Sequence, residues 1–231
     1  MTRTPQARVN VSIGILALQG AFAEHQAMLQ KLSPKVHVVL VRTPDELTQC
    51  DALIIPGGES TTIALLARIS GLADPLKTFV KTRAVWGTCA GAILLSSQVT
   101  GAKRGGQDLL GGMAVHIARN GWGSQVESFE AQLQVAGLRE PDVPFTGVFI
   151  RAPVVLELTA SPDGPPIEVL ARVPDALVPS SLAADVSAPH RSVVALRQGR
   201  HLMTTFHPEL TPDARFHEYF VRECVLPYVS A

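Results

Sequence analysis

The chain has 231 residues, a length that suits one α/β domain with a single sizeable hydrophobic core. Hydrophobic residues make up 46% of it and charged residues 17%, a balance that excludes a largely disordered chain. The 20 basic residues balance the 20 acidic ones, so the composition gives no sign of a nucleic-acid or anionic-membrane partner.

The N-terminal region loosely resembles a secretory signal, with two arginines ahead of an apolar run. Asn10, Ser12 and Gln19 interrupt that run, so a buried first strand followed by a ligand-side loop explains it better. No stretch of the sequence approaches the roughly 20 consecutive apolar residues of a membrane span. Cys50 and Cys224 lie in apolar segments and are expected in the core.

Strands and helices alternate through the first half of the chain. We expect strands at 9–18, 36–41, 52–55 and 84–86, with helices at 21–32, 61–70 and 75–81 and after residue 89. Repeated strand–helix units predict an α/β fold, a mostly parallel central sheet with helices on both faces. Ligands of such sheets gather beyond the carboxyl ends of the strands.

The second half is richer in short strands, expected at 115–118, 129–135, 146–150, 167–173, 192–197 and 201–205. Residues 198–200, Gln-Gly-Arg, predict a hairpin turn between the last two strands. A helix at 213–224 is expected to pack back on the sheet. We interpret 1–231 as a single domain with a flexible N-terminus at 1–8 and a mobile surface insertion at 174–191, rich in Pro, Ala and Ser.

The strand at 52–55 runs into Pro-Gly-Gly-Glu-Ser at 56–60. Paired glycines let backbone N–H groups approach a ligand closely, so the Gly58 N–H is a candidate oxyanion donor. Glu59 and Ser60 would then face a polar substrate. A phosphate-binding loop is the alternative, but the segment lacks the Gly-Lys-Ser/Thr ending of that motif. A helix cap at Ser60 is compatible with either role.

The next strand leads into Gly-Thr-Cys-Ala-Gly at 87–91, and an apolar helical run follows. This spacing is typical of a nucleophile elbow, which lifts a nucleophile above the sheet, so Cys89 is the candidate nucleophile. The Ala90 N–H is a second candidate oxyanion donor. A buried structural cysteine is the alternative, and glycines two positions before and after Cys89 make it the weaker one.

A thiolate needs a base, and Phe-His-Pro-Glu at 206–209 follows the last strand. Residues two apart in an extended segment face the same way, so His207 and Glu209 can act as base and orienting carboxylate. A surface histidine beside a solvated glutamate is the alternative, but the position after a strand favours the site. His116, His190 and His217 show no partner pattern and are treated as non-catalytic.

These three motifs together resemble the class I (triad) glutamine amidotransferases, and the likeness spans about 13–225. More narrowly the chain is similar to the glutaminase subunits of pyridoxal 5′-phosphate synthase. That narrower likeness rests on Leu-Ala-Leu-Gln-Gly-Ala-Phe at 16–22, Ala-Arg-Asn at 118–120, Gln-Val-Glu-Ser-Phe-Glu at 125–130 and the segment 145–153. The resemblance implies a flavodoxin-like three-layer sandwich and a glutamine pocket lined by Gly58, Glu59, Ser60, Arg119, Ile150 and Arg151.

The resemblance also implies hydrolysis of L-glutamine through a thioester on Cys89, with no metal or cofactor, in a reducing, cytoplasmic compartment. The ammonia would pass to a (β/α)8-barrel synthase subunit, whose docking is expected to complete the oxyanion hole. The alternatives are a glutaminase serving another ammonia acceptor, a thiol hydrolase or peptidase, and a regulatory protein that keeps the fold. Two segments depart from the family pattern, namely 121–124, where relatives show Phe-Gly-Arg, and the insertion at 174–191.

Overall fold

The structure is a computed structural model that describes residues 10–33, 35–101, 106–119, 121–122, 128–159, 164–178 and 190–229. Seven strands form its central sheet: β1 (Val11–Leu16), β2 (Val36–Val41), β3 (Ala52–Ile55), β4 (Ala84–Thr88), β10 (Ile167–Arg172), β11 (Val193–Gln198) and β12 (His201–Thr204). Their order is β10-β11-β12-β4-β3-β1-β2. The five strands from β12 to β2 pair in parallel, while β10, β11 and β12 pair antiparallel.

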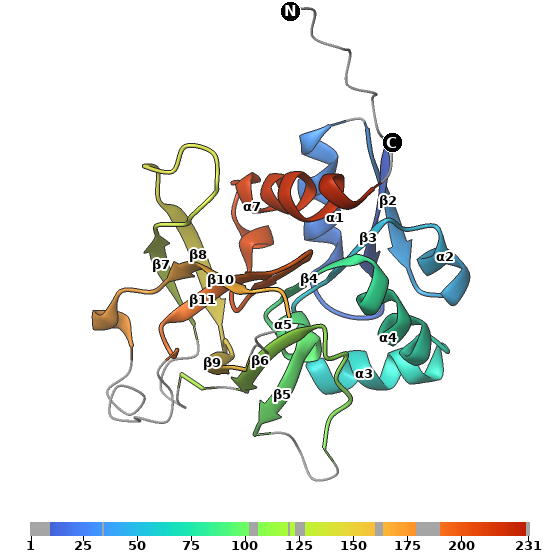
Figure 1. The fold of residues 1–231 in the computed structure, drawn as a ribbon, viewed down its shortest axis with the longest axis horizontal. Helices are drawn as coiled ribbons and strands as arrows, with labels where there is room; N and C mark the ends of the chain where they lie inside the picture. Colours follow the sequence, from blue (N-terminus) through green and yellow to red (C-terminus); the bar gives the residue numbers. More distant parts are fainter. Residues whose placement is uncertain are drawn as a thin grey trace, which may run out of the picture.

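Helices cover both faces of this sheet (Figure 1). On one face lie α1 (Phe22–Leu32) and α7 (Arg215–Tyr219), the latter continued by a π-helical segment, Phe220–Val225. On the other lie α3 (Ser60–Ile69), α4 (Ala73–Thr82) and α5 (Ala90–Leu95). The predicted three-layer α/β sandwich is therefore confirmed. All residues of β3 and β4 are buried, as expected for central parallel strands covered on both faces.

Two smaller sheets stand beside the main one. β5 (Ser96–Thr100), β6 (Met113–Ala118) and β9 (Val154–Leu158) form a three-stranded sheet. β7 (Ser128–Leu133) and β8 (Phe145–Ile150) form an antiparallel pair. The sequence analysis missed β5 and β9, because short apolar runs do not distinguish a strand from a helix or loop.

One short helix was also missed, α2 (Pro44–Thr48). Its five residues are too few to show a helical period of apolar residues, but the sequence at its N-terminus is typical of a helix start. The Thr43 hydroxyl accepts from the Glu46 N–H at 3.3 Å, and the Glu46 carboxylate accepts from the Thr43 N–H at 2.9 Å. This reciprocal capping box, with Pro44 at the first helical position, is sufficient to start a helix.

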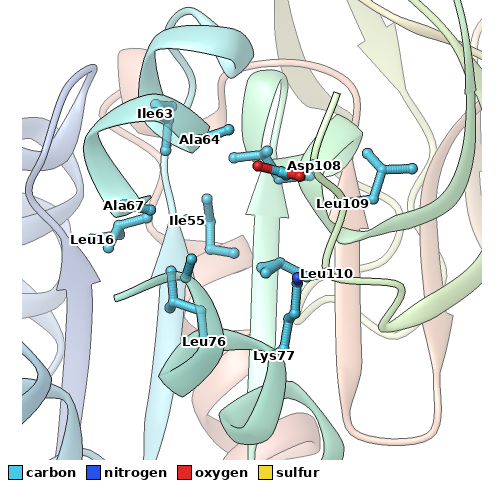
Figure 2. Close-up of a pocket in the computed structure, with 12 residues that line it drawn as sticks. Leu16, Ile55, Ile63, Ala64, Ala67, Leu76, Lys77, Asp108, Leu109 and Leu110 are labelled. Atoms are coloured by element: carbon cyan, nitrogen blue, oxygen red, sulfur yellow. The ribbon is translucent and has the colours of Figure 1, made fainter. Parts of the chain in front are cut away.

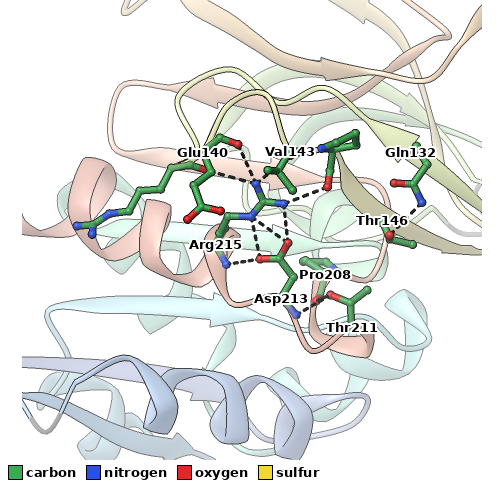
Figure 3. A network of polar contacts seen from close by, with 10 residues as sticks. Gln132, Glu140, Val143, Thr146, Pro208, Thr211, Asp213 and Arg215 are labelled. Atoms are coloured by element: carbon green, nitrogen blue, oxygen red, sulfur yellow. Dashed lines mark hydrogen bonds and ion pairs between the residues drawn. The ribbon is translucent and has the colours of Figure 1, made fainter.

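The C-terminal helix begins at Arg215, two residues after the predicted start at Asp213. The Asp213 carboxylate accepts from the Arg215 N–H at 2.9 Å, so Asp213 lies ahead of the helix. The Arg215 guanidinium also donates to the carbonyls of Glu140 and Val143 (Figure 3). These bonds tie the chain that leads into β8 to the start of α7.

The remaining predicted elements are present with ends shifted by a few residues, and the hairpin between β11 and β12 is confirmed. Of the proposed insertion, 179–189 lies outside the described residues, as does the N-terminal segment 1–8. Asp175–Leu177, at its start, forms a 3-10 turn.

Within the ranges given above, no helix is long and apolar enough to cross a membrane.

Candidate active site

Cys89 lies at the turn where β4 ends and α5 begins, with φ 48° and ψ −104°. A positive φ is uncommon for a residue with a side chain, and it is the backbone geometry that a nucleophile elbow requires. A Cβ atom on Gly87 would meet the carbonyl of Gly91, and one on Gly91 would meet the carbonyl of Ile55. Because these neighbours are backbone atoms that cannot rotate away, the turn needs both glycines.

His207 follows β12, which pairs in parallel with β4, so His207 and Cys89 lie at the same edge of the sheet. The Cys89 N–H donates to the Thr204 carbonyl at 2.9 Å, and the His207 N–H donates to the Val148 carbonyl of β8 at 2.8 Å. The imidazole lies beside the Cys89 side chain, since a Cβ atom placed on Gly57 would contact both. On its other side, its Nδ1 lies 2.7 Å from Oε1 of Glu209. The Cys89 side chain, the imidazole and the Glu209 carboxylate therefore follow one another in a single series.

The surroundings of His207 favour its charged form. Burial by itself lowers the pKa of this imidazole, but the hydrogen bonds and negative charges of Cys89 and Glu209 outweigh it and raise the pKa to about 10. Glu209 is only 4% exposed, so little water screens its charge. An imidazolium therefore faces Cys89 at neutral pH, an arrangement that stabilises a thiolate.

A cavity of about 490 Å³ opens over the sulfur of Cys89. It is lined by Gln19, Gly58, Glu59, Ser60, Cys89, Ala90, Ile93, Arg119, Ile150, Arg151, Pro153 and His207. All the residues expected from the sequence to bind substrate or an oxyanion are on this lining. Ala90 is the first residue of α5, so its N–H has no acceptor within the helix. Glu209 lies behind His207 and does not line the cavity.

One wall of the cavity is a polar network. The Arg119 guanidinium donates to a Glu59 carboxylate oxygen at 2.8 Å, and Thr61 donates to the other oxygen at 2.6 Å. The side-chain carbonyl of Gln107 accepts from both Arg119 and Ser60, each at 3.2 Å. Ser60 is not the N-cap of α3, since that position is Glu59. Arg119 holds the loops of this wall together through its contact with Glu59.

The profile of the SNO glutamine amidotransferase family matches residues 15–226. The chain belongs to this family. A probable pyridoxal 5′-phosphate synthase subunit PDX2 from Arabidopsis thaliana is 45% identical over 227 residues, 92% of this chain and 85% of that one. The pyridoxal 5′-phosphate synthase subunit PdxT of Chloroflexus aggregans is 45% identical over 212 residues, 91% of this chain and 99% of that one.

A solved structure described as a glutamine amidotransferase is 42% identical to this chain. It superposes with a TM-score of 0.72 and covers 90% of this chain and 96% of its own. The flavodoxin-like amidotransferase fold expected from the sequence is thereby confirmed.

Two features of this amidotransferase's site were not predicted. Gln19, after β1, accepts from the Glu59 N–H at 2.8 Å through its side-chain carbonyl and lies against Gly58. A polar residue just beyond the first strand, followed by Gly20 with φ +101°, is the signal that could have indicated it. In addition, the Ile150 carbonyl lies 3.9 Å from the Cys89 sulfur, so this residue contacts the site through its backbone.

His217, which shows no partner pattern in the sequence and was treated as non-catalytic, has a partner in the structure. It is fully buried, and its Nε2 lies 2.8 Å from Nδ1 of His25. His116 also has a partner, since its Nε2 lies 2.8 Å from the Thr100 hydroxyl. Of the segment that departs from the family pattern, Trp122 is buried against Phe129, with ring centroids 5.0 Å apart, and 123–124 lie outside the described residues.

A second cavity of the amidotransferase, between α3, α4 and the chain at 108–110, is of another kind (Figure 2). Its volume is about 30 Å³, and mostly aliphatic side chains such as Leu16, Ile55 and Ile63 line it. A space of that size with so few polar groups suits neither glutamine nor a well-bonded water. The cavity over Cys89 is therefore the candidate active site.

Proposed function

We propose that this chain is the glutaminase subunit of a pyridoxal 5′-phosphate synthase. It hydrolyses L-glutamine to L-glutamate and ammonia and delivers the ammonia to a synthase subunit. The observation that carries the proposal is the series Cys89–His207–Glu209 beside a cavity large enough for glutamine. The names of the relatives from Arabidopsis thaliana and Chloroflexus aggregans support the pathway.

Glutamine binds with its side-chain amide over the sulfur and its polar groups against the wall formed by Glu59, Ser60 and Arg119. The Cys89 thiolate attacks the amide carbon, and the carbonyl oxygen takes up the negative charge. The backbone N–H groups of Gly58 and Ala90 stabilise this oxyanion, and one such donor lowers the activation barrier by roughly 3 kcal/mol.

Collapse of the tetrahedral intermediate breaks the carbon–nitrogen bond. The imidazolium of His207 supplies the proton, so that neutral ammonia leaves and a γ-glutamyl thioester remains on Cys89. The imidazole, now neutral, accepts a proton from a water molecule that attacks the thioester. Glutamate leaves, and the thiolate–imidazolium pair is restored. Glu209 keeps Nδ1 protonated, so that Nε2 faces the reacting groups.

The proposed partner is a (β/α)8-barrel synthase subunit that receives the ammonia, and the proposed compartment is the cytoplasm. The buried free thiols at Cys50 and Cys224, with Cys89, suit a reducing compartment. The test measures glutamate release by the purified chain with and without such a barrel subunit, together with pyridoxal 5′-phosphate formation by the mixture. Glutamate release and cofactor formation by the mixture support the proposal; a mixture that does neither would overturn it.

A thiol hydrolase or peptidase on the same fold is the second candidate. The two are separated by labelling Cys89 with a glutamine-derived electrophile. Protection by glutamine and not by peptides supports the glutaminase, because the polar wall is built for a free amino acid. Protection by peptides alone would support the hydrolase.

A further inference from the structure

Two histidines that the mechanism does not use lie directly behind the triad. His25 comes from α1 and His217 from α7, and both are fully buried. The His217 Nε2 is 2.8 Å from the His25 Nδ1. On the far side of the His25 ring, Nε2 lies 3.4 Å from Oε2 of Glu209 and 3.3 Å from the Thr88 hydroxyl. A continuous row of polar groups thus runs from α7 through α1 to Glu209.

The protonation of this row follows from burial. Burial lowers the pKa of His25 well below its ordinary value, and the electrostatic interactions of His25 with His217 and His207 lower it further. Burial also lowers the pKa of His217, to about 3. Both rings are therefore neutral, and each carries one N–H. In each neutral ring the proton is on either Nδ1 or Nε2.

The atoms around each ring decide which nitrogen carries the proton. The His25 Nε2 faces two oxygens that can accept, the Thr88 hydroxyl and Oε2 of the Glu209 side chain, which pairs with His207 through Oε1, so Nε2 carries the N–H. His25 Nδ1 is then an acceptor, which requires His217 Nε2 to donate. His217 Nδ1 becomes a bare acceptor, and it has no hydrogen-bond partner among the described residues. A buried lone pair costs less than a buried unpaired N–H, so this assignment is the consistent one.

Packing fixes the two rings in place. The indole of Trp86, two residues before Thr88 on β4, meets the His25 ring edge-on at a centroid distance of 5.5 Å. It meets the His217 ring in the same way at 4.9 Å. Among the described residues no His, Cys, Asp and Glu cluster is arranged to hold a metal ion, so this row is not a metal site in that part of the chain. The row ends at Oε2 of Glu209, 3.4 Å from the His25 Nε2.

We propose that His25 is a positioning residue for catalysis, whose Nε2–H is directed at the Glu209 carboxylate and the Thr88 hydroxyl and whose tautomer is fixed by His217. Among the described residues Oε2 has no hydrogen-bond partner, and its 3.4 Å contact with the His25 Nε2 is what orients it, so without His25 it would lack a fixed orientation. A rotated carboxylate would release Nδ1 of His207 and allow the wrong tautomer. The inference rests on the proposed function, because it assigns His25 a role in that same site.

Two substitutions of His25 separate the donor from the bulk of the side chain. His25→Gln places an amide N–H near the position of Nε2 and keeps the donor to Glu209. His25→Asn places its amide near Nδ1, keeps a partner for His217 and loses that donor. His201→Gln is the matched control, since His201 accepts from the Val85 N–H at 3.2 Å on the same sheet and touches none of the triad. Folding of every variant is checked by thermal unfolding.

Glutamine hydrolysis by the complex with the barrel subunit is measured at several glutamine concentrations. We expect His25→Asn to lower kcat by about tenfold or more with KM unchanged, and His25→Gln to retain most of kcat. His201→Gln should leave both constants near those of the unsubstituted chain. Equal kcat for the Asn and Gln variants, or a change confined to KM or to thermal stability, would overturn the inference.

Alkylation of Cys89 by iodoacetamide provides a readout that needs no substrate. His207 lies beside Cys89, so a change in the orientation of the imidazole, which follows when Glu209 is no longer held, should slow alkylation of the Asn variant relative to the Gln variant. If the unsubstituted chain with its partner does not hydrolyse glutamine, the proposed function fails, yet this comparison still tests the role of His25. Identical alkylation rates in the two variants would be enough to reject the positioning role of His25, whatever the glutaminase kinetics show.

Discussion

At the scale of the residue, the site depends on a conformation that most side chains avoid. Cys89 has φ 48°, and such strain persists only where the surrounding structure imposes it. Here the glycines on either side allow backbone from β3 and α5 to approach within contact distance. The sulfur is thereby lifted to the rim of the sheet, where it meets His207.

Gly57 provides a direct test of that meeting. A Cβ atom there would lie 2.8 Å from the His207 Nδ1 and 3.3 Å from the Cys89 Cβ, so it would displace the imidazole. We expect Gly57→Ala to lower kcat/KM for glutamine by about 100-fold, the cost of roughly 1 Å of misplacement. Glutaminase kinetics and a thermal unfolding curve are the measurements. Full activity in a folded variant would mean that His207 is not the base in this position.

The residues predicted from the sequence are those whose role follows from local chemistry. A cysteine between two glycines and a histidine two residues from a glutamate carry their signal within a few positions. His25 and His217 carry none, because they are 192 positions apart and meet only when α1 and α7 pack on one face of the sheet. Their burial in an apolar layer could not be derived before the layer itself was known.

At the scale of the element, the parallel strands bring distant segments together. Gly58, Cys89 and His207 each follow the carboxyl end of a parallel strand, and β3, β4 and β12 are neighbours in the sheet. Alternation of strands and helices predicted this edge correctly. The exact start of α7 was not predicted, because the hydrogen bonds of Arg215 to Asp213 and to the distant chain ahead of β8 decide it. The strands β5 and β9 were not predicted because short apolar runs do not distinguish a strand from a helix or loop.

Arg215 joins the start of α7 to the chain ahead of β8, and its loss should be measurable as a loss of stability. Its guanidinium donates to carbonyls of the chain ahead of β8 and to Asp213, and its side chain is 16% exposed (Figure 3). Lysine cannot donate in so many directions, so Arg215→Lys should lower the free energy of unfolding by about 2 kcal/mol. Chemical denaturation measures this. In the same variant, the backbone N–H groups within residues 139–144 should exchange with solvent faster than in the unsubstituted chain.

The matched control is Arg68→Lys. Arg68 lies 3.4 Å from Asp108 in a pair whose side chains are 61% and 52% exposed. Exposed pairs contribute little, so this change should cost well under about 1 kcal/mol. Equal losses for the two variants would contradict the structural role assigned to Arg215.

At the scale of the whole molecule, buried histidines make stability depend on pH. Burial lowers the pKa of His217 to about 3. Between pH 6.5 and 3 this imidazole is therefore protonated in the unfolded chain and neutral in the folded chain. Stability that is present above pH 6.5 is therefore lost as the pH falls. His25 acts in the same direction.

His217→Gln removes one such proton, so the slope of unfolding free energy against pH below 6.5 should decrease by about 1.4 kcal/mol per pH unit. Urea denaturation at a series of pH values measures the slope. An unchanged slope would show that His217 is protonated in the folded chain.

His207 acts in the opposite direction. Burial opposes its charge, but its bonds to Cys89 and Glu209 raise its pKa to about 10. Its contribution to stability is complete below pH 6.5 and is lost as the pH rises toward 10. The buried thiols of Cys50 and Cys224, whose pKa burial raises to about 12, add to the alkaline loss. The free energy of unfolding should therefore be greatest near neutral pH.

The most direct measurement is a search for the covalent intermediate. The complex with the barrel subunit is mixed with glutamine, quenched in acid within the first turnovers, digested and analysed by mass spectrometry. We expect a γ-glutamyl group on the peptide that contains Cys89, and neither this group nor glutamate release from Cys89→Ala. Continued glutamate release by Cys89→Ala, with no modified Cys89 peptide in the unsubstituted chain, would contradict the account.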